Sequence, residues 1–286
     1  MKYTRRTLML GSLALPAICR AQAGAEGIQD DPFATLERKF GGRLGVSILN
    51  TGTGARLDHR ADERFPLCST FKLLAVSLLL TRVDRGQDRL DHRVHLTKDN
   101  LISNSPVTER LTAEGMTLAE LCAAAITVSD NTAANLILDR IGGPPGVTAY
   151  VRSLGDNVTR LDRNEPSVNE ATPGDPRDTT TPAAMRNDLN AVVLGNALSA
   201  NSRQQLTTWL LGCQTGAKRL QAGLPAGWKI GDKTGSGDHG VANDIGVIWP
   251  PGQAPRIVTA YYAESPASAE QRNLVLAEVG RIASGV

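Results

Sequence analysis

The spacing of apolar residues changes from helical to strand-like near the start of the chain. Residues 31–40 have a helical pattern that stops at Gly41 and Gly42, and glycine commonly ends helices. Residues 43–49 alternate apolar and small side chains as a β-strand does, and residues 50–54 have the composition of a hairpin turn. We therefore predict one helix followed by a strand and a tight turn.

Between about residue 69 and residue 211 the pattern is mostly helical. Thr117 and Glu120 have the spacing of a capping box at the start of an alanine-rich helix. Further helices are predicted over residues 132–141 and 145–154, and glycine follows each of them.

Strand patterns return after residue 225. Residues 228–231, 245–249 and 257–262 are predicted strands, and residues 269–282 are a predicted final helix. Both ends of the chain are therefore rich in strands and the middle is helical. The simplest fold class is α+β, with an antiparallel sheet from both chain ends flanked by helices and an all-α domain inserted.

This pattern also predicts a division into domains. We assign residues 24–60 and 212–286 to an α/β domain and residues 61–211 to a helical domain. A cleft between two such units is a natural place for a ligand.

The composition is that of an ordinary globular protein. The 286 residues are 41% hydrophobic and 21% charged, which allows a sizeable core and argues against disorder. Aromatic residues make up only 4%, which argues against the stacking platforms that bind single-stranded nucleic acid. The net charge of +2 comes from residues 1–23, because the rest has 27 basic and 29 acidic residues. We expect no nucleic-acid partner.

Residues 1–23 have the features of a twin-arginine signal peptide. Arg5 and Arg6 precede an apolar stretch over residues 8–18, and Ala21 and Ala23 are the small residues that a signal peptidase needs. The apolar stretch is too short to span a bilayer, and a buried N-terminal helix is the alternative. We predict a bacterial periplasmic protein, monomeric and without membrane contact once the leader is removed.

Cysteine and histidine residues give no sign of a metal site. Cys19 leaves with the leader, and sequence alone does not decide whether two of Cys68, Cys122 and Cys213 form a disulfide. No zinc-type cysteine spacing, no HExxH motif and no GxSxG motif is present. We expect no metal and no cofactor.

Ser69 and Lys72 are three residues apart where an apolar helix is predicted to begin, so their side chains share one face. The backbone N–H groups of a helix start can stabilise an oxyanion, and a desolvated lysine amine can act as the base for a serine. The pair alone is weak evidence. On this pair alone, a serine N-cap followed by a solvated lysine is the preferred interpretation.

Ser129, Asp130 and Asn131 form a second motif, between two predicted helices. These residue types are also good helix caps, so capping is an alternative to a role in chemistry.

Lys233, Thr234, Gly235 and Ser236, followed by Gly237, form a third motif. It follows a predicted strand, so we expect its cation and hydroxyls at the strand end, facing the cleft. Gly235 lets a ligand lie close to the backbone. A glycine-rich hairpin edge protected by a lysine is the alternative.

The three motifs have the order and spacing of the serine penicillin-recognising enzymes, and from about residue 33 onward the chain resembles a class A β-lactamase. The resemblance implies that Ser69 is the nucleophile, Ser129 a proton shuttle and Asn131 an amide that orients the substrate. It implies an oxyanion hole made by the backbone N–H groups of Ser69 and Ser236. The residues implied to hold the substrate carboxylate are Lys233, Thr234, Ser236 and Arg219.

A fourth motif distinguishes an enzyme that hydrolyses its acyl-enzyme from a protein that is only acylated. Residues 163–178 are rich in proline, glycine and charge, which suits an Ω-loop. By the resemblance, Glu165 and Asn169 hold the water that attacks the acyl-enzyme, and the bond from Glu165 to the following proline is cis. Arg163 and Asp178 resemble the pair that clamps the ends of the loop. A surface acidic loop is the alternative.

The sequence departs from the family pattern at several positions. Asn104 stands where an aromatic residue usually walls the cleft. Cys68 and Cys122 match positions that pair in some relatives, but the partner positions hold Gly237 and Val76 here. Neither familial disulfide is therefore expected.

The resemblance implies a metal-free serine hydrolase that opens the lactam amide of penicillins and cephalosporins, which are small-molecule β-lactam substrates, and so gives antibiotic resistance. The motif from Lys233 to Ser236 also resembles that of cefotaxime-hydrolysing relatives. A penicillin-binding D,D-peptidase would lack the Glu165 and Asn169 pair, and a β-lactam sensor would ordinarily need a membrane span or effector domain. Whether Lys72 or Glu165 is the acylation base stays open.

Overall fold

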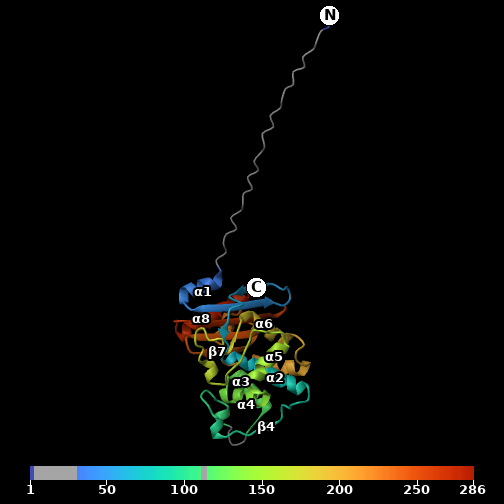
Figure 1. The fold of residues 1–286 in the computed structure, drawn as a ribbon, viewed down its shortest axis with the longest axis vertical. Coiled ribbons are helices and arrows are strands. Elements are labelled where there is room, and N and C mark those ends of the chain that lie inside the picture. Colours follow the sequence, from blue (N-terminus) through green and yellow to red (C-terminus); the bar gives the residue numbers. More distant parts are fainter. Residues whose placement is uncertain (3–30, 111–114) are drawn as a thin grey trace. The chain divides into compact units, whose positions relative to one another are not determined.

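Five strands from both ends of the chain form one antiparallel sheet. The computed structural model describes residues 1–2, 31–110 and 115–286, so the predicted twin-arginine pair, apolar stretch and cleavage site lie outside the described residues. The strands follow the order β2-β1-β9-β8-β7, which makes β7 an edge strand. Figure 1 shows β1 in blue beside the red C-terminal strands. The strands are β1 (Arg43–Asn50), β2 (Arg56–His59), β7 (Lys229–Gly237), β8 (Val241–Trp249) and β9 (Arg256–Ala263).

Two helices from opposite ends of the described chain pack on one face of this sheet. The Asp31 side chain caps α1 (Pro32–Phe40) by accepting a hydrogen bond from Phe33 N at 2.9 Å. α8 (Ala269–Ala283) begins with a capping box at Ser268. Phe33 and Leu276 from these helices form a buried cluster with apolar residues of the sheet. Burial of this apolar area holds the two chain ends together.

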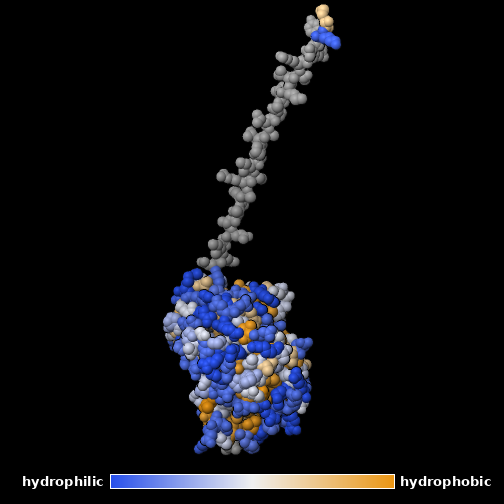
Figure 2. All heavy atoms as spheres, in the orientation of Figure 1, coloured by the Kyte–Doolittle hydropathy of each residue, from blue (hydrophilic) through white to orange (hydrophobic). Residues whose placement is uncertain are grey.

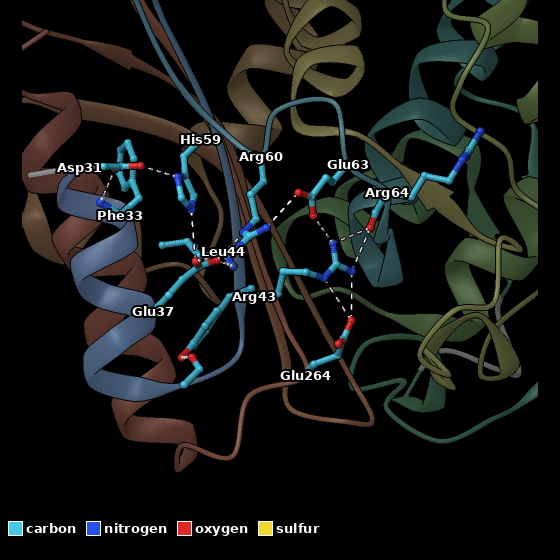
Figure 3. Close-up of polar contacts among 12 residues, drawn as sticks. Asp31, Phe33, Glu37, Arg43, Leu44, His59, Arg60, Glu63, Arg64 and Glu264 are labelled. Atoms are coloured by element: carbon cyan, nitrogen blue, oxygen red, sulfur yellow. Dashed lines mark hydrogen bonds and ion pairs between the residues drawn. The ribbon is translucent and has the colours of Figure 1, made fainter.

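An ion-pair network ties α1 to the sheet (Figure 3). His59 Nδ1 lies 2.6 Å from Asp31 Oδ2, and Arg60 donates to Glu37 at 2.8 Å. Exposed pairs of this kind each contribute little to stability, but here they share partners. The charged residues of the network are Asp31, Glu37, Arg43, His59, Arg60, Glu63 and Glu264.

The helical part of the molecule lies between β2 and β7 in sequence. α2 is at its centre, and its side chains are buried on almost every face. The predicted capping box is confirmed, because Thr117 N donates to Glu120 Oε2 at 2.7 Å and Glu120 N donates to Thr117 Oγ1 at 3.2 Å. The helices are α2 (Phe71–Asp84), α3 (Leu118–Thr127), α4 (Asn131–Ile141), α5 (Gly143–Ser153), α6 (Pro182–Leu189) and α7 (Ala200–Leu211).

Two short pairings complete the strands. β3 (Phe65–Pro66) pairs with β6 (Thr179–Thr180), and β4 (Arg93–Val94) pairs with β5 (Met116–Thr117). The first of them lies next to the segment that carries Ser69, and joins that segment to the end of the predicted Ω-loop.

The predicted position of the third motif relative to its strand is wrong. We expected residues 233–237 to follow a strand, but they lie within β7, which pairs with β8 from Lys229 as far as Gly237. The glycine and polar residues gave no apolar alternation there. Hydrogen bonding to β8 nevertheless keeps the backbone extended, since pairing with a neighbour outweighs intrinsic strand preference.

The face in Figure 2 is mainly hydrophilic, with apolar residues scattered over it. Among the described residues, no helix combines the length and the apolar character needed to cross a membrane.

Candidate active site

Ser69 lies in a short 3₁₀ turn, Cys68–Thr70, that leads directly into α2. Its side chain is almost buried, and its Oγ donates a hydrogen bond to Glu165 Oε1 at 3.0 Å. Cys68 has a positive φ of 43°, in the left-handed region. The turn therefore presents the Ser69 hydroxyl at the start of α2, as the sequence predicts.

Lys72 follows one helical turn after Ser69 and is fully buried. Its Nζ donates to Ser129 O at 2.8 Å and to Asn131 Oδ1 at 2.7 Å, and lies 3.0 Å from Glu165 Oε1. Burial lowers the pKa of Lys72 from its usual value, and the negative charge of Glu165 opposes this effect. Lys72 thus connects two predicted catalytic residues, Ser129 and Glu165, with the predicted substrate-binding residue Asn131.

The second motif has both of the roles that its sequence allows. Asp130 caps α4, with Oδ1 accepting from Ala133 N at 2.9 Å. Ser129 and Asn131 are turned toward the site instead. Ser129 Oγ accepts from Lys72 Nζ at 3.2 Å and from Lys233 Nζ at 3.1 Å. The backbone of Ser129 has a positive φ of 61°, which aims its side chain between the two lysines.

The segment from Arg163 to Asp178 is a loop with only one short 3₁₀ turn, as expected for an Ω-loop. Arg163 Nε lies 2.5 Å from Asp178 Oδ2, and Asp178 Oδ1 accepts from the backbone N of Asp162 and of Arg163 at 2.7 and 2.9 Å. Asp178 is nearly fully buried. This pairing closes the two ends of the loop.

Glu165 is held in the site from two sides. Asn169 Nδ2 donates to Glu165 Oε2 at 2.5 Å, and the Glu165–Pro166 peptide bond is cis. On α4, the Asn135 side chain donates to Glu165 O at 2.9 Å and accepts from Glu165 N at 3.0 Å. The loop backbone is therefore fixed against a helix, with the carboxylate aimed at Ser69 and Lys72.

The third motif forms the opposite wall of the site. Lys233 is fully buried, and burial together with the charge of Lys72 lowers its pKa to about 7. Thr234 Oγ1 lies 2.5 Å from Thr215 Oγ1. Arg219 donates to Ser236 Oγ at 2.6 Å and to Gly235 O at 2.7 Å. Cation, hydroxyls and guanidinium thus gather at one edge of the sheet.

A cavity of about 380 Å³ lies between these walls. Lys72, Glu165 and Lys233 lie behind its surface, each at most 4% exposed. The structure therefore brings every predicted site residue to this cavity or directly behind it, and Arg163 and Asp178 close the loop beside it. The lining residues are Ser69, Asn104, Val128, Ser129, Asn131, Asn169, Thr215, Arg219, Thr234, Gly235 and Ser236.

Sequence reasoning missed three polar residues of the site. Asn135 follows Asn131 by one helical turn, so helical spacing could have placed both on one face. Thr215 touches Thr234, and Asn273 of α8 accepts from Arg219 Nε at 3.1 Å. These last two come from distant segments, and no local pattern marks them.

The structure also shows the surroundings of two positions that depart from the family pattern, Asn104 and Cys68. Asn104 has a positive φ of 58°, and its side chain donates to Ser129 O at 3.2 Å, so it lines the cavity with an amide. Cys68, Cys122 and Cys213 are all free thiols. A Cβ built on Gly237 would lie 2.7 Å from Cys68 Sγ, which places the two familial partner positions side by side.

Comparisons with known proteins agree with this geometry. A family model described as the β-lactamase enzyme family matches residues 30–285. The chain is 48% identical to β-lactamase CTX-M-8 of Citrobacter amalonaticus over 96% of this chain and 92% of that protein. It is 49% identical to β-lactamase L2 of Stenotrophomonas maltophilia, over 95% of this chain and 93% of that one.

A solved structure leads to the same family. An ancestral class A β-lactamase, GNCA, superposes with a TM-score of 0.86 at 61% identity, over 87% of this chain and 96% of the other. The predicted α+β fold, with a sheet from both chain ends and a helical insertion, is confirmed. The chain belongs to the class A serine β-lactamases.

Proposed function

We propose that Ser69, Lys72, Ser129 and Glu165 carry out the hydrolysis of β-lactam amides in this enzyme through an acyl-enzyme on Ser69. Hydrolysis of β-lactams, with the resistance that it gives, is the activity of this family. The observation that carries the assignment of residues is the position of Glu165 Oε1, which lies 3.0 Å from both Ser69 Oγ and Lys72 Nζ. One carboxylate oxygen thus touches the nucleophile and the buried amine.

Glu165 is the better candidate for the base that activates Ser69. The Ser69 hydroxyl donates to Glu165, so its proton already points at the carboxylate. The Lys72 amine lies within 3.2 Å of four oxygens, Ser129 O, Ser129 Oγ, Asn131 Oδ1 and Glu165 Oε1, so each of the three donors of an ammonium group has an acceptor. These contacts favour the charged lysine despite its burial, and a charged lysine cannot take a proton.

Ser129 is placed to deliver a proton to the lactam nitrogen. Its Oγ accepts hydrogen bonds from Lys72 and from Lys233, so its own hydrogen is left to point into the cavity. When the lactam C–N bond breaks, that hydrogen passes to the leaving nitrogen. A flanking ammonium can then replace the proton that Ser129 has lost.

Glu165 and Asn169 together suit the second half of the reaction. Asn169 Nδ2 is used by Glu165 Oε2, but Asn169 Oδ1 is buried and has no hydrogen-bond partner. An orphaned acceptor beside a carboxylate favours a water molecule there. The proton that Glu165 took from Ser69 first passes to Lys72, which lies 3.0 Å away and has given its own proton to Ser129. Glu165 then takes a proton from the water as the water oxygen attacks the ester carbon of the acylated Ser69. When the ester bond breaks, this proton returns to Ser69 Oγ.

Lys233, Thr234 and Ser236 bind the substrate carboxylate, because a cation with two hydroxyls matches that anion. Arg219 contributes its charge and orients the Ser236 hydroxyl. The backbone N–H groups of Ser69 and Ser236 stabilise the oxyanion.

Residues 1–23 direct the protein to the periplasm through the twin-arginine route, and it acts there as a monomer without a cofactor.

Turnover of a chromogenic cephalosporin tests this proposal. The wild-type protein should hydrolyse many equivalents rapidly, whereas a D,D-peptidase or a sensor would stop after about one acylation. Ser69→Gly should lose turnover and the covalent penicillin adduct together. A penicillin adduct that persists elsewhere in Ser69→Gly would remove Ser69 from its role. Rates for penicillins, cefotaxime and carbapenems would then define the substrate range.

A further inference from the structure

Two buried carboxyl groups lie behind the substrate-binding strand, and the proposed mechanism uses neither of them. Asp232 precedes Lys233 in β7, and Asp244 lies in β8 opposite Thr234. Asp232 is 2% exposed and Asp244 is fully buried. The strand register pairs Asp232 with Gly246 and Thr234 with Asp244, so the two aspartates are diagonal neighbours on one face of the sheet. Asp232 Oδ2 and Asp244 Oδ1 are both buried, and neither has a hydrogen-bond partner in the described part of the chain. A proton shared between the two carboxyl groups would give each of these oxygens a partner.

The charged surroundings of the pair favour a single negative charge. Burial raises the pKa of Asp232, and burial together with the charge of Asp232 raises the pKa of Asp244 well above its usual range. The titratable and charged groups that face the pair are Cys213, Lys233 and Arg219, and Arg272 of α8 lies near Arg219. Lys233 and Arg219 stabilise one carboxylate in this buried pair, but two adjacent buried carboxylates would repel each other.

The pair also supports the turn that carries Arg219. Asp244 Oδ2 accepts from Leu220 N at 3.1 Å. A Cβ built on Gly216 would lie 1.8 Å from Asp232 Oδ2, so only glycine allows the turn to lie this close to that carboxyl. Arg219 N donates to Gly216 O at 2.8 Å and closes the turn. Both ends of the turn therefore contact the carboxyl pair.

From this turn the contacts continue into the cavity. Arg219 Nη2 donates to Ser236 Oγ at 2.6 Å, and Arg219 Nη1 donates to Gly235 O at 2.7 Å. Arg219, Gly235 and Ser236 all line the cavity. A change in the charge or spacing of the carboxyl pair would thus move a wall of the site without touching the reacting atoms.

We propose that Asp232 and Asp244 share one proton in the resting enzyme and act as positioning residues, holding the Arg219 turn against β7 for binding of the substrate carboxylate. The inference rests on the proposed function, which places the carboxylate at this wall. Loss of the shared proton places two anions in contact and draws the Arg219 guanidinium away from Ser236. Binding of the substrate then weakens, while the geometry around Ser69 and Glu165 is retained.

Infrared spectroscopy of the full chain, labelled with ¹³C in the aspartate carboxyl groups, tests the shared proton without any substrate. At neutral pH we expect the C=O band of a protonated carboxyl group that disappears in Asp244→Asn. Asp188→Asn is the matched control, because Asp188 is another buried aspartate with a raised pKa, in α6. It should remove a band of its own and leave the first. If neither Asp244→Asn nor Asp232→Asn removes an acid band, the shared proton is refuted.

Steady-state kinetics test the positioning role. Asp244→Ala should raise KM for a penicillin about tenfold, the effect of losing roughly one hydrogen bond, with a smaller change in kcat. Asp244→Asn should restore most of the loss in KM, because an amide can still donate to Asp232 and accept from Leu220 N. Equal losses in both variants, or a loss confined to kcat, would overturn the positioning role.

A second variant covers the case in which Asp244→Ala does not fold. In Asp232→Ala, Asp244 has no neighbouring carboxyl group to share a proton with, and its carboxylate competes with Ser236 for Arg219, so KM should again rise with little change in kcat. Asp232→Asn should keep most of the affinity, because its amide can still donate to Asp244. An unchanged KM in a folded Asp232→Ala would contradict the inference. A wild-type enzyme without β-lactam turnover would refute the proposed function, and the infrared result would still decide the protonation of the pair.

Discussion

Ser69 Oγ donates directly to Glu165 Oε1 at 3.0 Å, across 96 positions of the sequence. This contact depends on the fold of the Ω-loop, because Glu165 has no helix or strand of its own to hold it. The loop is fixed by the ion pair between its ends and by Asn135 of α4. Catalysis and the local stability of the loop are therefore coupled in this enzyme.

Asp178→Ala should destabilise the protein and slow deacylation. The substitution leaves Arg163 and two backbone N–H groups without their buried acceptor. Breaking such a buried pair costs about 3 kcal/mol. Urea unfolding measures the loss of stability, and kcat measures the effect on deacylation. Arg177→Ala removes an exposed pair in the same loop and should change both much less. Similar effects in the two variants would argue against a specific role for the clamp.

Lys233 should make substrate binding sensitive to pH near neutrality. Its pKa is lowered to about 7 by burial and by the charge of Lys72, so its cation is lost as the pH rises through this value. KM for substrates with a carboxylate should then increase above pH 7. Lys233→Arg keeps its charge to much higher pH and should flatten this dependence. A KM that is independent of pH in the wild-type enzyme would contradict the assignment of Lys233 to carboxylate binding.

Asp188 should make the folded protein less stable as the pH rises. Burial and the neighbouring Asp156 raise its pKa to about 9, whereas the unfolded chain has the ordinary value of about 4. At a pH between these two pKa values, Asp188 carries a proton in the folded state that it has released in the unfolded state. The free energy of unfolding therefore falls by about 1.4 kcal/mol per pH unit from this group, and the loss is complete above about pH 9.

Asp188→Asn checks this linkage. An amide can donate to Asp156 without needing a proton from solvent, so the variant should gain stability over the wild type at pH 7 to 9 and little at pH 4. Urea unfolding at these pH values measures the difference. A stability difference that does not change with pH would show that Asp188 is ionised in the folded protein.

Much of the fold was predictable because local rules and tertiary packing agree. The capping box at Thr117 and the glycine that ends α4 mark helix ends by backbone chemistry that needs no distant partner. β7 was predicted too short, because its second half gains its extended form from β8 rather than from its own residues. The sequence pattern is therefore informative where the backbone hydrogen bonds join residues close in sequence, as at helix ends. It is uninformative where they join the segment to a distant strand, as in the second half of β7.

The active-site residues also fall into those that sequence spacing predicts and those that only the tertiary fold brings together. Ser69 and Lys72 are related by one helical turn, so their proximity follows from spacing. Asn273 lies 54 positions from the Arg219 that it contacts, and Asp244 carries no motif that links it to Asp232. Such contacts depend on how the sheet and α8 pack, which sequence spacing does not contain. The resemblance to a family supplied Glu165, whose partners come from three separate segments.

The central claim is that Ser69 is acylated and that Glu165 is needed to release the acyl group. Mass spectrometry of Glu165→Ala after mixing with benzylpenicillin tests this most directly. We predict that the variant accumulates a stable penicilloyl adduct on the peptide that contains Ser69, while the wild-type enzyme shows none after turnover. Undiminished turnover by Glu165→Ala, or the absence of any adduct on Ser69, would contradict the claim.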